Sequence, residues 1–232
     1  MGDHRRRPGL SADAPHARLA GFLYLGTIGF GVYAEVVARG ALIVRGDAAA
    51  TAQAIFASGS TFRLGMIADL AMLGCYIGVT ILLHGIFRMG APRISATAAS
   101  FSLIGIAMLA CDTLLSAMIL RLPDLGQPSS SLADWVYLLL RVHGDGYKIS
   151  LVFFGAYCLL LGWLIWRGGA MPRAIGLLVA AAGACNLVNS LAWLGAPLWA
   201  AQLPQYFTLP TLLGELALAL WLLAFGIRER EA

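Results

Sequence analysis

The sequence predicts an all-α fold: a polytopic transmembrane bundle of six helices, with both termini on the cytoplasmic side. Hydrophobic residues make up 59% of the 232 residues and charged residues only 12%, and the mean hydropathy is +0.79. Soluble domains are about 25% charged and about half apolar. Because so few charges cannot cover a water-exposed surface, lipid must surround most of this chain.

The apolar residues are grouped in runs that have the length of membrane spans. Residues 1–16 are polar and rich in Arg, Pro and Ala, and we expect a disordered cytoplasmic tail there. The first run is too long for a secretory signal and shows no clear cleavage site, so we expect it to be retained. At about 20 residues a span, the transmembrane domain covers 17–228, with spans at 19–38, 62–87, 94–120, 145–166, 173–195 and 207–227.

Two kinds of connection join these spans. Short turns with Gly and Pro, each flanked by Arg, connect the second span to the third (88–93) and the fourth to the fifth (167–173). Longer loops are expected on the opposite side, and each has the pattern of a short interfacial helix. These two helices are predicted over Ala48–Ala57 and Leu132–Val142.

The basic residues predict the orientation. With the N-terminus inside, the cytoplasmic side holds ten of the 16 Arg and Lys residues and the outer side holds six. The positive-inside rule therefore favours cytoplasmic termini, in a multi-pass protein of the bacterial inner membrane. Because the basic residues are scattered singly rather than along a stripe, we expect no binding to nucleic acid.

Ionisable and amide side chains inside the spans are the candidate functional residues, because such groups are costly in a membrane. All of them fall in the predicted outer half, and this common depth predicts one polar pocket that opens outward. The candidate ligand-binding residues are Arg63, Asp69, Asp112, His143, Asp145, Tyr147, Lys148, Asn186, Asn189 and Glu215.

Several of these polar residues also have an ordinary structural explanation. Glu35 and Arg39 are four residues apart on one helix and are equally well explained as an interfacial ion pair. Asp145 lies between two glycines and is more typical of a helix cap. Asn186 and Asn189 are also typical of hydrogen bonds between membrane helices.

Three carboxylates are harder to explain structurally: Asp69, Asp112 and Glu215. Each needs a cation, a proton or water at such a depth. The candidate cations are three of the six basic residues of the outer side: Arg63, Arg141 and Lys148.

No metal site is predicted, and the cofactor stays unknown. His84 and His143 lie near opposite ends of their helices and cannot share one haem iron. The four cysteines lie singly inside apolar runs without a CxxC pair. The sequence also lacks the common hydrolase, phosphate-loop and dinucleotide motifs.

Several stretches resemble a known family. Residues 46–70 read GDAAATAQAIFASGSTFRLGMIADL and residues 143–166 read HGDGYKISLVFFGAYCLLLGWLIW; MPRAIGLL and GELALALWLL follow. Over about 17–228 the chain is similar to a bacterial family of six-helix membrane proteins that is catalogued only as a domain of unknown function. The family pattern at the fourth helix is H-D-x-G-Y, and the chain departs from it in having His143-Gly144-Asp145-Gly146-Tyr147. The motif positions are matched by Arg63, Asp69, His143, Gly146, Tyr147 and Glu215.

Three classes of function are compatible with these patterns. The first is a binding or permeation protein, in which a small polar or cationic ligand enters from outside and meets Asp69, Asp112 and Glu215. The second is an intramembrane enzyme acting on a lipid-like substrate, with His143 as acid or base and carboxylates as partners or metal ligands. The third is a structural or accessory subunit whose buried polar residues serve packing. The oligomeric state is not predicted.

Overall fold

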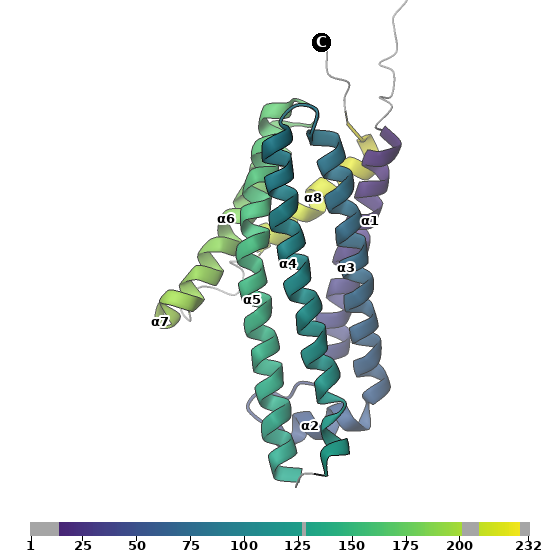
Figure 1. Cartoon of the computed structure of the whole chain (residues 1–232), viewed down its shortest axis with the longest axis vertical. Coiled ribbons are helices and arrows are strands. Elements are labelled where there is room, and N and C mark those ends of the chain that lie inside the picture. Colours follow the sequence, from purple (N-terminus) through teal and green to yellow (C-terminus); the bar gives the residue numbers. More distant parts are fainter. Residues whose placement is uncertain (1–13, 127–128, 201–208, 228–232) are drawn as a thin grey trace, which may run out of the picture.

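The apolar runs fold as α-helices, because a backbone in hydrocarbon must satisfy its own hydrogen bonds. The computed structural model describes residues 14–126, 129–200 and 209–227, and no strand occurs among them (Figure 1). The elements are α1 (Ala14–Val32), the π-helix η1 (Tyr33–Arg39), α2 (Ala48–Ala57), α3 (Gly59–Phe87), α4 (Pro92–Ile119), the 3₁₀ helix η2 (Leu122–Leu125), α5 (Ser129–Gly168), α6 (Arg173–Gly195), α7 (Pro197–Ala200) and α8 (Leu209–Phe225).

Within the described ranges, five helices are long and apolar enough to cross a membrane: α1 with η1, α3, α4, α5 and α6. This confirms the prediction of an all-helical, multi-pass protein in contact with the bilayer. The helix α8, which corresponds to the sixth predicted span, has 17 residues. Of the predicted tail, 1–13 lie outside the described residues, whereas 14–16 already belong to α1.

Each long helix packs against the next one in a closed ring: α1, α3, α4, α5, α6, α8 and back to α1. One end of the ring carries both Arg-flanked turns, and we call it the turn end; the other carries α2, η2 and the start of α5, and we call it the α2 end (Figure 1). In this view α6 leans away from the bundle and ends well short of α2. The α2 end is therefore formed mainly by α2, α3, α4 and α5.

Aromatic side chains fill the ring between its two ends. Tyr76 of α3 stacks on Phe154 of α5 with their ring centroids 4.8 Å apart, and Tyr24 of α1 and Tyr157 of α5 lie beside Tyr76. A second apolar cluster at the α2 end includes Ile55, Phe62 and Val136.

The two predicted interfacial helices have different outcomes. The first is confirmed as a helix, since α2 covers Ala48–Ala57 and the Ala50 N–H donates a 2.8 Å hydrogen bond to the carboxylate of its cap, Asp47. The second was wrong as a separate helix, because Leu132–Val142 is part of α5, which runs unbroken for 40 residues. That stretch contains no proline, and single glycines cost a helix only about 1 kcal/mol each. Asp145 is consequently inside a helix and does not cap one.

Candidate functional site

A buried ion pair between η1, which continues α1, and α3 is the centre of the polar site. Arg39 donates from Nη1 and Nη2 to the two carboxylate oxygens of Asp69, at 2.6 and 3.0 Å. Its Nε donates to Glu35 Oε2 at 2.9 Å. Arg39 is 7% exposed and Asp69 is 5% exposed. The bidentate pair with Asp69 fixes both side chains, and the bond to Glu35 engages the third guanidinium nitrogen of Arg39.

The π-helix η1 holds Arg39 in this position. α1 leads directly into η1, whose wider turns end at Arg39. In this segment Ala38 and Arg39 are buried, and Ala38 packs where a side chain at Gly65 of α3 would lie. Irregular turns of this type are frequent at functional sites. The end of the first span is therefore packed against α3 and is not a free interfacial turn.

A cavity of about 90 Å³ lies beside the ion pair. Such a volume holds several water molecules. Its walls combine charged, polar and apolar side chains from α1, η1, α3, α4 and α5: Gly31, Glu35, Arg39, Asp69, Met72, Leu73, Leu109, Thr113, His143 and Tyr147. Three of the predicted site residues, Asp69, His143 and Tyr147, therefore meet around one cavity.

Asp112 of α4 lies next to this cavity. It is 6% exposed, and its Oδ2 is buried without a hydrogen-bond partner in the described part of the chain. The titratable side chains near it are His143, Arg39 and Asp69. Its carboxylate lies against Gly146 of α5, where a Cβ would collide with it. A glycine at 146 is thus what allows Asp112 to be buried at the α4–α5 contact.

His143 is oriented by the same segment of α4. Its Nδ1 lies 3.3 Å from the backbone carbonyl oxygen of Asp112. Because a carbonyl can only accept, Nδ1 must carry the hydrogen in this contact. In the neutral ring Nε2 is then an acceptor, on a side chain that lines the cavity.

Glu215 interacts electrostatically with several tyrosines, one of which, Tyr147, lines the cavity beside Arg39. Glu215 lies on α8, close enough to the hydroxyls of Tyr24, Tyr76 and Tyr157 to interact with them electrostatically. All three hydroxyls are buried without a hydrogen-bond partner among the described residues. Glu215 does not line the cavity beside Arg39. The expected meeting of Glu215 with Asp69 and Asp112 in one pocket is thus not visible in the contacts.

The remaining predicted residues lie elsewhere on the bundle. Lys148 Nζ is 3.4 Å from Asp145 Oδ1 and 4.4 Å from the centre of the Trp193 ring. The amide oxygen of Asn186 accepts a 2.8 Å hydrogen bond from Thr211, which joins α6 to α8 as expected for a contact between helices. The half-buried Asn189 lies one turn further along α6. Arg63 is exposed and lines a separate cavity between α3 and α4.

The cation that pairs with Asp69 was missed by the sequence reasoning. Arg63, Arg141 and Lys148 were the expected partners, and the structure instead pairs Asp69 with Arg39. The expected ion pair between Glu35 and Arg39 is formed. It is only part of the arrangement, because Arg39 also pairs with Asp69. The available signal was the position of Arg39 at the end of its apolar run, at the same expected depth as Asp69 on the next span. No group of three metal-binding side chains occurs among the described residues.

The fold and the site define a helical, multi-pass membrane protein with a buried charged pair beside a small polar cavity. Residues 19–226 match the family described as "Domain of unknown function (DUF4386)", and the chain belongs to this family. An uncharacterized protein of Archaeoglobus fulgidus is 30% identical over 83 residues, which are 36% of this chain and 48% of that relative. The match thus spans about half the length of the relative. No solved structure matches the chain.

Proposed function

We propose that this protein binds or passes a small cationic or polar ligand at the cavity beside Arg39 and Asp69. The supporting observation is an excess of negative charge: Glu35, Asp69 and Asp112 supply three carboxylates, whereas Arg39 is the one guanidinium bonded among them. Arg39 uses three of its five N–H donors on Glu35 and Asp69, and none of these hydrogen bonds goes to Asp112.

The energetic reason for a cationic ligand is the burial of Asp112. A charged group removed from water costs several kcal/mol unless it is paired and hydrogen-bonded. Asp69 is paired and hydrogen-bonded to Arg39. The Oδ2 of Asp112, in contrast, has no hydrogen-bond partner among the described residues. A cation in the neighbouring cavity would offset this cost, and Glu35 and Tyr147 lie in the same cavity wall to contact it.

We further propose that α8 is a sixth span and that both termini are cytoplasmic, in a bacterial inner membrane. At about 1.5 Å per residue, 17 residues reach the lower limit for a span. α8 also packs between α1 and α6 and closes the ring. The two short Arg-flanked turns lie at the turn end, which would then face the cytoplasm. The cavity accordingly lies in the outer half of the membrane.

Binding to the purified protein tests the ligand proposal. The protein would be placed in nanodiscs of a neutral phospholipid and titrated calorimetrically with methylammonium, a cation small enough for the cavity. We expect saturable binding that weakens about tenfold or more, or about 1.4 kcal/mol, in Glu35→Gln and in Asp112→Asn. The matched control is Asp134→Asn, which removes an exposed carboxylate of α5 near the α2 end and should change nothing.

The structural-subunit alternative predicts a different result. It expects no saturable binding to the unchanged protein, together with a loss of thermal stability in Asp112→Asn. Equal methylammonium affinity in all three variants and the unchanged protein would also contradict a ligand site at this cavity.

A further inference from the structure

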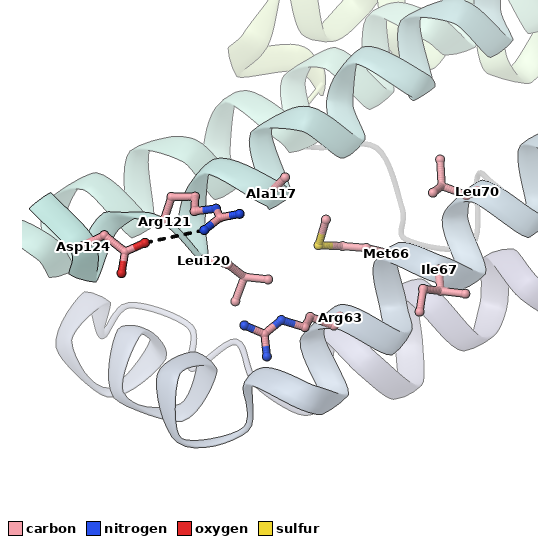
Figure 2. A pocket seen from close by; sticks show the side chains of 8 residues that line it. All are labelled: Arg63, Met66, Ile67, Leu70, Ala117, Leu120, Arg121 and Asp124. Atoms are coloured by element: carbon pink, nitrogen blue, oxygen red, sulfur yellow. Dashed lines mark ion pairs between the residues drawn. The ribbon is translucent and has the colours of Figure 1, made fainter.

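A second, larger cavity lies between α3 and α4 at the α2 end. Its volume is about 540 Å³, and Figure 2 shows the side chains that line it. Met66, Ile67 and Leu70 of α3 form one wall, and Ala117 and Leu120 of α4 form the opposite wall. Ile67 is 60% exposed and Leu70 is 56% exposed, so the groove is open along its side. In a membrane these exposed apolar walls face lipid chains.

The mouth of this groove is basic. Arg63 comes from the first turns of α3, and Arg121 lies just beyond the end of α4 (Figure 2). Arg63 has no ion pair or hydrogen bond in the described part of the chain. Arg121 has an ion pair with Asp124 at 3.8 Å, in which both side chains are largely exposed. Exposed pairs of this kind contribute about 0–1 kcal/mol, so a better anion can displace Asp124.

Along the groove the charged residues come first and the apolar residues follow, which matches the order of headgroup and acyl chains in a phospholipid. Leu70 lies seven positions after Arg63 on α3, which corresponds to about 10 Å along the helix. The arginines lie at the helix ends, where headgroups are found, and the apolar walls extend from there toward the middle of the membrane. Basic pockets between membrane helices are known sites for lipid headgroups.

We infer that this groove binds one anionic phospholipid from the leaflet at the α2 end. Arg63 and Arg121 hold its phosphate, and its acyl chains lie against Met66, Ile67 and Leu70. Two arginines and Asp124 give the mouth a net charge of +1. A headgroup with one negative charge neutralises that excess, whereas a zwitterionic headgroup leaves it uncompensated. The inference does not depend on the proposed cation site, because the two cavities have no lining residue in common.

The test compares lipids added to the detergent-purified protein, with the unfolding temperature and lipid retention in native mass spectrometry as measurements. Phosphatidylglycerol should raise the unfolding temperature and stay bound, whereas phosphatidylcholine and phosphatidylethanolamine should do neither. The double variant R63Q/R121Q should lose most of the phosphatidylglycerol shift. The matched control is Arg141→Gln, since Arg141 is a basic residue of α5 that stacks on Tyr137 and does not line the groove.

Two further measurements distinguish the possible results. The charge-preserving variant R63K/R121K should keep most of the shift, and a loss equal to that of R63Q/R121Q would contradict a charge-based site. Inorganic phosphate at millimolar concentration should neither stabilise the protein nor displace the lipid. Stabilisation by phosphate alone would point to a free anion and overturn the lipid site, as would equal stabilisation by phosphatidylcholine.

Discussion

Among single residues, Arg39 has the largest electrostatic role, because it is a buried cation that holds two carboxylates. The sequence shows it only as a basic residue at the end of an apolar run, within reach of Glu35. In the structure it also forms the bidentate pair with Asp69, which links the first span to α3. Removing one partner of such a pair leaves the other as an uncompensated buried charge.

Arg39→Gln is therefore expected to destabilise the protein by about 3–5 kcal/mol, the range for breaking a buried ion pair. Denaturant unfolding in detergent, followed by circular dichroism, would measure the loss. Arg63→Gln is the matched control, because Arg63 is exposed and forms no ion pair among the described residues.

The double variant R39Q/D69N should recover part of that loss, because it removes both charges. If Arg39→Gln unfolded at the same denaturant concentration as Arg63→Gln, the pair would not stabilise the bundle.

At the level of elements, the contact between α5 and α6 depends on glycine. Gly155 faces Gly183, and Gly162 faces Gly176, so the two backbones approach closely. A Cβ at Gly183 would lie 2.6 Å from the carbonyl oxygen of Gly155, and a Cβ at Gly162 equally close to that of Gly176. Small residues permit this packing in membranes, where association depends on close contact rather than on the hydrophobic effect.

Gly183→Ala should consequently lower the unfolding temperature, because the new methyl group meets backbone atoms that cannot move away. Gly85→Ala is the control: a Cβ there has nothing within 4 Å, and alanine favours a helix by about 1 kcal/mol over glycine. Thermal unfolding of both variants in the same detergent checks the difference. The opposite order of stabilities would show that α5 and α6 can separate at little cost.

At the level of the whole molecule, the closed ring of helices places the polar site and the lipid groove toward the same end. The bonds between α3 and α4 lie on the other side of the site: Thr80 contacts Ser102 at 2.7 Å, and His84 contacts Ser95 at 2.9 Å. Toward the α2 end this helix pair instead forms the walls of the groove. Which face of the membrane has access to both cavities therefore depends on the orientation of the ring.

The proposed orientation predicts which exposed positions react in intact cells. Single cysteines at Met89, in the turn after α3, and at Asp124, in η2, would be introduced into a chain without its four native cysteines. A membrane-impermeant maleimide should label Asp124→Cys from outside and Met89→Cys only after permeabilisation. Labelling of Met89→Cys in intact cells would reverse the orientation and place both cavities on the cytoplasmic side.

The sequence alone determined the lipid environment, the helical class, five of the long apolar helices and the position of α2. These properties depend on local hydropathy and on hydrogen bonds that each helix makes within itself. The family resemblance is also confirmed, by the match over residues 19–226.

Only the tertiary structure decided which polar residues meet. Asp69 pairs with Arg39 because the first span packs against α3, and Glu215 lies near tyrosines because α8 packs between α1 and α6. Depth along a helix can be counted from the sequence, but the direction in which a side chain points around the ring depends on the neighbouring helices. The continuity of α5 has a similar origin. A residue that is typical of a helix cap, such as Asp145, does not end a helix whose neighbours continue to pack against it.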